Sequence, residues 1–389
     1  MMIKREIEKL LKQYSKQFRA IAVIGPRQSG KTTLVKKVFP KKAYVSLENP
    51  DDRLFADSDP RGFLERYKDG AIIDEAQRVP ALFNYMQQIL DETKKEGLFI
   101  LTGSNNFLLQ ESITQSLAGR IGIIDLLPLT FHEITSSHKT FLSTNQLILN
   151  GSYPEIYDKK RKNDLWYQAY IRTYIERDVK QIRNIDNTIL FNKFLKLCAG
   201  RIGQQLNVAN LSNECGIDIK TVNSWLGILQ SSYIIYLLQP HFVNFNKRVV
   251  KSPKLYFVDT GLACVLLGLK NESELEQSVF RGSLFENYII LEWLKKKYNN
   301  GSLYSLYYWR DNKGIEIDLL IDSSGKLLPI EIKSSQTFNE DFLKPIKQWN
   351  NFSKHKGGIL VYDGKSSYKR SDHFEVIYWR DHLTKNKLS

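Results

Sequence analysis

Residues 25–32 read GPRQSGKT, a phosphate-binding loop of the form GxxxxGK[ST] between an apolar run and a helical stretch. The two glycines let the backbone turn tightly around phosphate oxygens, the lysine neutralises the outer phosphates, and the threonine hydroxyl is a ligand for Mg²⁺. The following helix adds the positive end of its dipole. We therefore predict that ATP and Mg²⁺ bind at this loop. The predicted nucleotide-binding residues are Gly25, Pro26, Arg27, Gln28, Ser29, Gly30, Lys31, Thr32 and Thr33.

A second motif, AIIDE at residues 71–75, is a short apolar strand that ends in two carboxylates. Asp74 is placed to hold Mg²⁺ together with Thr32, and Glu75 is placed to orient the attacking water. The alternative is an exposed acidic strand end without chemistry. Because the phosphate loop lies upstream, the catalytic interpretation is favoured, with Lys31 as the third catalytic group.

Apolar runs alternate with helical stretches through the first 128 residues, as a parallel α/β sheet requires. The fourth strand runs into TGSNN, which places Ser104 and Asn105 where a polar sensor would face the γ-phosphate. The alternative is a simple polar turn over residues 102–106. The expected strands are Phe18–Ile24, Ala43–Leu47, Ala71–Glu75, Leu98–Leu101 and Ile121–Leu127.

Arg120 closes a helical stretch immediately before the fifth expected strand. An arginine at this point can reach a triphosphate bound to a neighbouring subunit and stabilise charge in the transition state, which predicts a homo-oligomer. An ordinary surface or interdomain ion pair is the alternative.

Composition indicates the cellular setting. The chain of 389 residues has three isolated cysteines, which suggest neither a disulfide framework nor a metal cluster. Its first residues are amphipathic, and no apolar run approaches the length of a membrane span. We therefore expect a cytoplasmic protein with no membrane partner. The net charge of +14 suggests an anionic partner such as DNA, although a lysine-rich proteome produces basic proteins without that function.

From residue 129 to 197 helical periodicity replaces the strand signals, which predicts a helical lid on the nucleotide domain. Aromatic and apolar residues recur at helical spacing and are expected in the core: Trp166, Tyr170, Tyr174 and Val179. Arginines on the same stretch could sense nucleotide, but a solvated or salt-bridged face is favoured for them: Arg172, Arg177 and Arg183.

Residues 206–235 show the layout of a helix-turn-helix, with Gly216 at the turn, a cap near Asp218 and a recognition helix over Thr221–Gln230. The next segment alternates apolar and polar residues, as the β wing of a winged helix does. Its tip is basic, with Lys247, Arg248, Lys251 and Lys254. We expect this unit to contact DNA, although winged helices also serve as protein–protein joints.

The last part of the chain contains two expected strands joined by a turn at residues 323–326. If Ser324 and Gly325 form a two-residue turn, Asp318 lies across from Glu331, and Glu331 shares a face with Lys333. Facing carboxylates repel unless a cation lies between them. Glu286, on a helical stretch, would add a third acidic group. Acidic groups with this ExK spacing are typical of restriction-type nucleases, in which carboxylates hold Mg²⁺ and the lysine activates water. A nuclease-like fold that binds without cleaving is the alternative.

Further segments complete a specific pattern along the chain: IIDEAQRVP, LTGSNN, LAGRIGIIDLLPLTFHE, GSYPEIY, YIERDV, YFVDTGLACVLLG, LFENYII and YWRDNKGIEIDLLI followed by PIEIK. Together with GPRQSGKTTL, they make nearly the full chain resemble a family of bacterial and archaeal AAA-type ATPases. Members carry a C-terminal domain of unknown function with a restriction-nuclease-like core. The resemblance implies the same two residue sets, one for nucleotide and Mg²⁺ (Gly30, Lys31, Thr32, Asp74 and Glu75) and one for the nuclease-like site (Glu286, Asp318, Glu331 and Lys333).

The predicted fold class is α/β. We expect a P-loop sheet over residues 1–128, a helical lid over 129–197, a winged helix over 198–275 and a mixed α/β nuclease-like domain over 276–389. Two functions remain open. One is an ATPase that couples nucleotide state to DNA binding, and the other is a nucleotide-dependent assembly switch with a structural C-terminal domain. The sequence indicates no particular protein partner.

Overall fold

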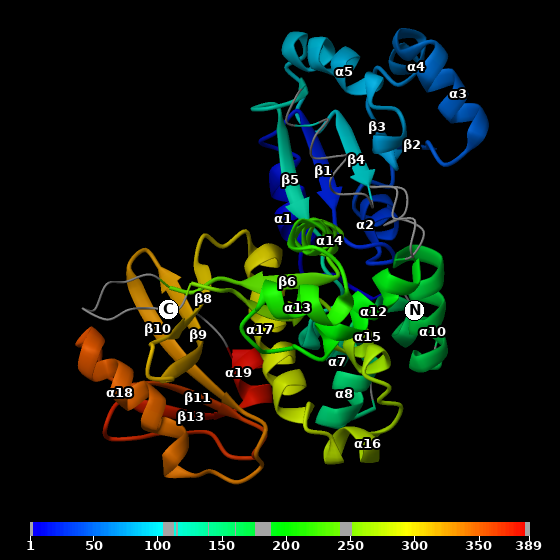
Figure 1. The fold of residues 1–389 in the computed structure, drawn as a ribbon. Helices are drawn as coiled ribbons and strands as arrows, with labels where there is room; N and C mark the ends of the chain where they lie inside the picture. The colour runs from blue at the N-terminus through cyan, green and yellow to red at the C-terminus, as the bar shows by residue number, and fades with distance from the viewer. Residues whose placement is uncertain are drawn as a thin grey trace.

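The computed structural model describes residues 3–103, 113, 116–138, 140–159, 161–175, 188–241 and 251–385. Within them the chain forms a five-stranded sheet, a two-stranded ribbon and a six-stranded sheet, in that order along the sequence (Figure 1). Of the helices in these ranges, none combines the length and the apolar character needed to cross a membrane.

The N-terminal sheet is parallel and has the strand order β2-β3-β4-β1-β5. All five expected strands are confirmed, with slightly different ends. Side chains alternate between the two faces of β1, so that Ile21 and Val23 enter one apolar core and Ala20 and Ala22 enter another. The strands are β1 (Ala20–Ile24), β2 (Ala43–Ser46), β3 (Ala71–Asp74), β4 (Phe99–Gly103) and β5 (Ile121–Asp125).

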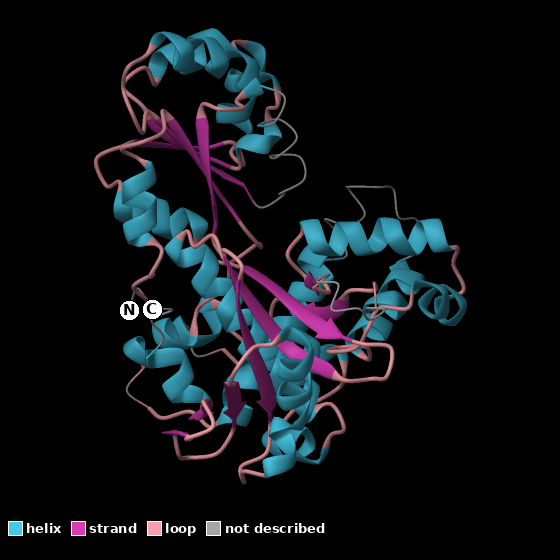
Figure 2. Ribbon diagram, turned by 90° about the vertical axis from the view of Figure 1, so that its left-hand side faces the viewer, coloured by secondary structure: helices cyan, strands magenta, loops and turns pink. Residues whose placement is uncertain are grey.

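Helices cover both faces of this sheet, as Figure 2 shows. Leu11 and Leu34 bring α1 (Glu8–Tyr14) and α2 (Lys31–Val38) to one face. Phe63 and Leu82 belong to a second group of helices, which packs on the opposite face of the sheet. That group consists of α3 (Pro50–Ser58), α4 (Pro60–Arg66) and α5 (Ala81–Glu92), and the short 3₁₀ turn η1 (Ala76–Arg78) directly precedes α5.

The next part of the chain is helical, as expected for residues 129–197. Trp166 and Tyr170 lie in the core, with 7% and 3% of their surface exposed, whereas Val179 lies outside the described residues. The helices are α7 (Phe131–Ser137), α8 (Thr144–Asn150), α9 (Pro154–Asp158), α10 (Asn163–Tyr170), the π-helical turn η2 (Ile171–Ile175) and α12 (Thr188–Ala199).

A helix-turn-helix layout follows. Gly216 ends α13 (Val208–Cys215) with φ of 78°, and the Asp218 side chain caps the backbone of α14 (Ile219–Ser231). The antiparallel ribbon of β6 (Ile235–Leu238) and β7 (Lys254–Phe257) comes next. Helix, glycine turn, cap and strand all lie where the sequence predicts them.

The expectation that Lys254 lies on an exposed basic wing is wrong. Lys254 is the first residue of β7, only 2% of it is exposed, and all four residues of this strand are buried. Lys251 is exposed. The other two tip residues, Lys247 and Arg248, lie outside the described residues. Alternation of polar and apolar residues does not reveal a buried lysine whose acidic partners are remote in the sequence.

The C-terminal sheet is mixed, with the order β12-β13-β11-β10-β9-β8. Its β9–β10 hairpin has the predicted two-residue turn: Ser324 and Gly325 both have positive φ, 55° and 85°. The strands are β8 (Ser305–Arg310), β9 (Glu316–Ser323), β10 (Lys326–Lys333), β11 (Gly358–Tyr362), β12 (Tyr368–Lys369) and β13 (Phe374–Tyr378). The helices of this part are α15 (Thr260–Leu266), α16 (Glu272–Gln277), α17 (Arg281–Asn300), the 3₁₀ turn η3 (Glu340–Leu343), α18 (Lys344–Ser353) and α19 (Trp379–Lys385).

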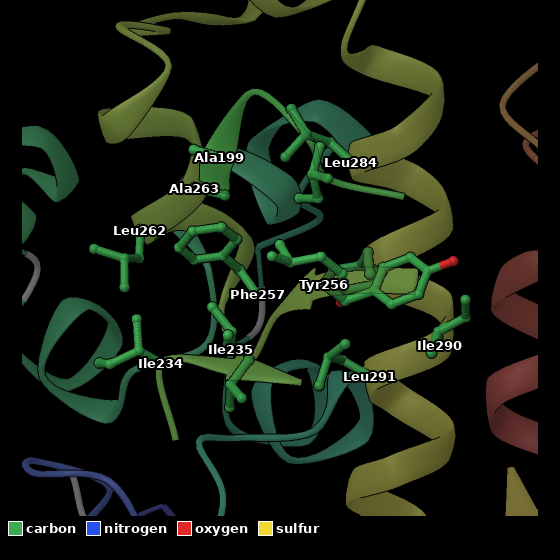
Figure 3. Packing of buried hydrophobic residues seen from close by; sticks show 14 of the residues in the cluster. Ala199, Ile234, Ile235, Tyr256, Phe257, Leu262, Ala263, Leu284, Ile290 and Leu291 are labelled. Carbon is green, nitrogen blue, oxygen red and sulfur yellow. The ribbon is translucent and has the colours of Figure 1, made fainter. Parts of the chain in front are cut away.

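One apolar core runs from Leu127 to Trp379 and crosses the predicted boundaries near residues 197 and 275. Figure 3 shows side chains from α12, β6, β7, α15 and α17 meeting in it. The helices of residues 131–199, the pair α13 and α14, and the C-terminal sheet are therefore packed together, and α17 runs through their centre.

Candidate functional site

The phosphate loop joins β1 to α2. Gly25 has φ of 146°, and a Cβ atom at this position would come within 2.2 Å of the Leu126 carbonyl oxygen. Gly30 has φ of 92° and lies at the N-terminus of α2. Lys31 is buried and donates hydrogen bonds to the carbonyl oxygens of Gly25 (3.0 Å) and Pro26 (2.8 Å). Burial lowers the pKa of Lys31 to about 8, against the opposing effect of Glu75 and Asp74.

Asp74, at the end of β3, accepts hydrogen bonds from three hydroxyl groups. Thr32 Oγ1 lies 3.1 and 3.0 Å from its two carboxylate oxygens, Tyr44 Oη lies 2.8 Å from Oδ2, and Thr102 donates to Oδ1. The hydroxyl and carboxylate that Mg²⁺ prefers are thus adjacent, so the residues fit this ion. The sequence assigns no role to Tyr44, and it places Thr102 in a polar segment after the fourth expected strand, whereas Thr102 lies inside β4.

Glu75 follows Asp74 with φ of 54° and ψ of 44°, a left-handed conformation that is uncommon outside glycine. Its carboxylate accepts a hydrogen bond of 2.5 Å from the side-chain amide of Gln77. Glu75 lines the same cleft as Lys31 and Thr32, so residues of both predicted motifs lie at one cleft.

This cleft has a volume of about 440 Å³, and the helical segment forms part of its wall through Pro154, Asp158 and Tyr174. Tyr174 Oη accepts a hydrogen bond of 2.7 Å from Gln28 Nε2, and the guanidinium of Arg27 lies 5.3 Å from the centre of the tyrosine ring. Tyr174 is therefore half-buried: its ring packs against the apolar core, as helical spacing predicts, while its hydroxyl reaches the cleft.

Arg5 gives the phosphate loop a second connection to the rest of the chain. Its guanidinium donates to the carbonyl oxygens of Ser29 (2.8 Å) and Leu127 (2.7 Å) and pairs with Glu133 on α7 at 3.1 Å. Only 6% of Arg5 is exposed. Arg5 lies in no sequence motif, so its contact with the phosphate loop could not be predicted.

The remaining predicted groups of the N-terminal half are placed as follows. Arg120 forms a two-bond ion pair with Asp91 of the same chain, at 2.6 and 2.9 Å, on the surface of α5. Arg172 is exposed. Ser104, Asn105, Arg177 and Arg183 lie outside the described residues. The trans role of Arg120 stays a prediction.

The C-terminal hairpin brings Asp318, Glu331 and Lys333 together. Ile330 pairs with Leu319, so the next position sets Glu331 across from Asp318, as the turn predicts. Lys333 Nζ lies 2.5 Å from Glu331 and 3.4 Å from Asp318. Burial and the nearby Asp318 carboxylate raise the pKa of Glu331 well above its usual value.

Two residues from other elements complete this cluster. Glu286 comes from α17, and Lys254 from β7 lies 2.8 Å from Glu286 and 2.7 Å from Glu316. Lysine ammonium groups therefore occupy the positions next to these carboxylates. Among the described residues no group of three or more histidine, cysteine, aspartate or glutamate side chains is placed to hold a metal ion. The present arrangement does not fit the divalent cation that the sequence predicts here at Glu286, Asp318 and Glu331.

A parallel sheet with a phosphate loop after β1, an acidic strand end on β3 and a cleft between them define a nucleotide-binding ATPase of the AAA type. Comparison with known families agrees with this class: residues 17–135 match the family described as an AAA domain. Residues 142–273 and 281–381 match two domains of unknown function, DUF8612 and DUF4143. The chain belongs to the family of the uncharacterized protein Rv2008c of Mycobacterium tuberculosis. The two are 31% identical over 322 residues, which cover 82% of this chain and 70% of the relative.

Three further similarities are weaker. An uncharacterized protein of Haemophilus influenzae is 23% identical over 304 residues, 73% of this chain and 70% of that protein. Among solved structures, the Walker-type ATPase PABY2304 of Pyrococcus abyssi is 14% identical, with a TM-score of 0.48, over 68% of this chain and 96% of that one. AMPPCP-bound DnaA from Aquifex aeolicus is 13% identical, with a TM-score of 0.30, over 58% and 85%.

Proposed function

We propose that this ATPase couples Mg²⁺-dependent ATP hydrolysis to the binding of duplex DNA in the cytoplasm. The observation that carries the proposal is the shared nucleotide cleft, whose walls come from the phosphate loop and from the helical segment that packs with the helix-turn-helix. A nucleotide in this cleft would contact both parts at once. The presence of the nucleotide, and whether it has been hydrolysed, would therefore bias how the phosphate loop and the helical segment are held together.

Mg²⁺ would be held by Thr32 and Asp74, where it would shield the charge of the outer phosphates. Lys31 neutralises the same oxygens, and Glu75 orients the water that attacks the γ-phosphorus. Beside the cleft lies an apolar cavity of about 110 Å³ that shares Gly30 and Pro154 with it. The nucleobase would fit there, between Ile3, Leu34 and Leu129.

DNA contact would come from α14. Its exposed residues include Lys220, Asn223 and Gln230, which are side chains that bond to phosphates and base edges. Lys251 is exposed next to the ribbon. The net charge of +14 favours such a partner through counterion release. The nuclease-like C-terminal domain would lie along the same duplex.

The second candidate is a nucleotide-dependent switch in which the C-terminal domain is structural. The ion pairs of Lys254 and Lys333 with the acidic cluster favour this alternative, because they neutralise carboxylates that a nuclease needs for metal. A DNA-coupled ATPase and an assembly switch differ in their response to DNA.

We therefore expect duplex DNA to stimulate ATP turnover. Phosphate release should be measured with and without duplex DNA and with Mg²⁺ or EDTA, and we expect DNA to raise the Mg²⁺-dependent rate several-fold. If ATP turnover did not change on addition of DNA, the coupling would be rejected and the nucleotide-dependent switch would remain as the proposed function. Turnover that persists in EDTA would reject the role of Mg²⁺.

A variant with Lys247, Arg248 and Lys251 all replaced by alanine is the matched control for the effect of DNA. It should weaken DNA binding and flatten the salt dependence of the affinity by a slope of up to about 0.9 for each lost phosphate contact. Basal turnover should be unchanged. A variant with the wild-type affinity and salt slope would show that these residues do not touch the duplex.

Arg120 belongs to the proposal as a group that acts across a homo-oligomer interface. To do so, it would exchange Asp91 for the phosphates of a neighbouring subunit. We expect Arg120→Ala to bind ATP normally and to hydrolyse it at least about a thousandfold more slowly. Excess Glu75→Gln subunits should restore part of the rate, because each variant supplies the group that the other lacks. A monomer in sedimentation with ATP present, or full activity of Arg120→Ala alone, would reject the idea.

A further inference from the structure

Arg5 holds the phosphate loop from a segment that lies outside both nucleotide-binding motifs. One nitrogen of its guanidinium, Nη1, donates to the Ser29 carbonyl oxygen at 2.8 Å, and Nη2 donates to the Leu127 carbonyl oxygen at 2.7 Å. The third nitrogen, Nε, lies 3.1 Å from a carboxylate oxygen of Glu133. The phosphate loop, the segment after β5 and the helix α7 therefore meet at one planar group.

Burial and planarity make this contact specific. Only 6% of Arg5 and 1% of Glu133 are exposed, so the charges lie where a lost partner is costly. A guanidinium carries its donors in a fixed plane, so a bond to one acceptor constrains the bonds to the others. The position of the Ser29 carbonyl is therefore set relative to Leu127 and α7, and not by the loop alone.

The contact with Ser29 determines which way one peptide of the loop faces. The peptide bond between Ser29 and Gly30 is trans, so its carbonyl and its N–H point to opposite sides. Because Arg5 holds the carbonyl, the Gly30 N–H is turned away from Arg5. Gly30 lines the nucleotide cleft at the N-terminus of α2, where backbone N–H groups bind phosphate oxygens.

The loop has conformational freedom at this point, which an external contact restricts. Gln28 and Gly30 both have positive φ, 61° and 92°, so Ser29 lies between two residues in unusual backbone conformations. Glycine adopts either sign of φ readily, so the peptide before Gly30 can change direction at low cost. The hydrogen bond from the Ser29 N–H to the Pro26 carbonyl oxygen is long, at 3.3 Å. The turn alone therefore fixes this peptide weakly.

We propose that Arg5 is a positioning residue of the nucleotide site. It holds the Ser29–Gly30 peptide so that the Gly30 N–H is directed to the phosphates before the nucleotide binds. Arg5 acts through this peptide and not by touching a phosphate. The inference rests on nucleotide binding at the phosphate loop, which is part of the proposed function. Since a preorganised loop needs less ordering on binding, loss of Arg5 should appear in the affinity and not in the chemical step.

The test is the full chain with Arg5→Met, which replaces the guanidinium by an apolar group. Calorimetric titration with a nonhydrolysable ATP analogue and Mg²⁺ should show an affinity lower by about tenfold, because the loop must then be ordered on binding. The value of kcat should stay within a few-fold of the wild type, since Asp74 and Glu75 follow a different strand. Lys4→Met, at the exposed neighbouring position, is the control and should match the wild type in both.

Inorganic triphosphate separates the phosphate loop from the apolar cavity that Arg5 also lines. This probe meets the loop but has no base to fill the cavity. Its affinity, measured by displacement of the ATP analogue, should fall in Arg5→Met by the same factor as that of the analogue. A loss confined to the analogue would assign Arg5 to the cavity and overturn the inference.

A second protein separates positioning from stability. Arg5→Met leaves the Glu133 carboxylate buried without its cation and should destabilise the fold. Adding Glu133→Gln removes that charge, so thermal unfolding should show a recovery of stability. The affinity for the analogue should nevertheless stay low, because the Ser29 carbonyl still lacks the guanidinium. An affinity that returned to the wild-type value together with the stability would show that Arg5 is merely structural.

Lys31→Ala tells a failure of this inference from a failure of the nucleotide site. If Lys31→Ala kept the wild-type affinity for the analogue, the phosphate loop would not bind nucleotide, and both proposals would fail. If Lys31→Ala lost affinity while the folded Arg5→Met/Glu133→Gln protein did not, only the role of Arg5 would be rejected.

Discussion

Lys31→Ala is expected to lower ATP affinity by at least about a hundredfold and to abolish hydrolysis. The side chain is buried in the loop and already donates to two carbonyl oxygens, so it needs little reorganisation to meet the phosphates. Charge-assisted hydrogen bonds contribute about 1.5–3 kcal/mol each. Loss of two such bonds therefore accounts for a hundredfold change or more. Calorimetric titration with a nonhydrolysable ATP analogue and Mg²⁺ measures the affinity directly.

Glu75→Gln is expected to separate binding from chemistry at the same site. The amide keeps the size of the side chain but cannot orient and polarise water as a carboxylate does. Affinity for ATP should stay within a few-fold of the wild type, while phosphate release should fall by about 10²–10⁴-fold, the usual effect of removing a positioned base. Unchanged hydrolysis would show that another group activates the water.

A matched control for the lysine is Lys41→Ala, which removes a charge from an exposed position just beyond α2. It should leave both affinity and turnover unchanged. If Lys31→Ala bound ATP as tightly as the control, the phosphate loop would not be the nucleotide site, and the assignment of the cleft would fail with it.

The nucleotide half of the structure could be predicted closely because its chemistry is local in sequence. Gly25, Lys31 and Thr32 lie within one loop, and Asp74 and Glu75 end one strand. In a parallel sheet the carboxyl ends of all strands lie at one edge, so the motifs after β1 and β3 converge there without any knowledge of side-chain packing. The hairpin cluster was predictable for a similar reason, because a two-residue turn sets the register of Asp318 and Glu331.

Contacts between remote segments could not be predicted in this way. Lys254 lies 32 residues from Glu286 and 62 from Glu316, and the pattern around it reads as a solvent-exposed wing. Tyr174 packs against the core as its spacing predicts, but its hydroxyl also accepts a hydrogen bond from Gln28 of the phosphate loop, a contact that spacing does not reveal. Arg5 binds Ser29 and Leu127 from a segment that carries no motif. In each case a tertiary partner decides the environment, and spacing along the chain carries no information about that partner.

A buried ion pair on α17 shows the same limit and gives the largest expected effect on stability. Glu292 and Lys295 lie 2.9 Å apart, with 5% and 2% exposed. Lys295 also donates to the Leu129 carbonyl oxygen (2.8 Å) and to Ser152 Oγ (2.9 Å), and Glu292 accepts from the backbone amide of Phe131 (2.8 Å). The pair thus connects α17 to the segment that follows the nucleotide sheet.

Lys295→Met is expected to destabilise the protein by about 3–5 kcal/mol, because it leaves the Glu292 carboxylate buried without its cation. Burial already raises the pKa of Glu292 even with the lysine in place. A carboxyl whose pKa is higher in the folded state binds more protons there than in the unfolded state, so stability falls as pH rises. The loss should therefore be smaller at about pH 5 than at about pH 8. Thermal unfolding at the two pH values measures both effects.

Two variants identify the cause of that loss. Adding Glu292→Gln to Lys295→Met removes the orphaned charge but keeps an acceptor for the Phe131 amide, so it should recover part of the stability and cancel the extra pH dependence. Lys297→Met, at a half-exposed position on the same helix, should change stability by less than about 0.5 kcal/mol. If Lys295→Met were as stable as Lys297→Met at both pH values, the ion pair would not hold α17 against the segment at residues 129–152. The apolar core alone would then join the nucleotide sheet to the rest of the chain.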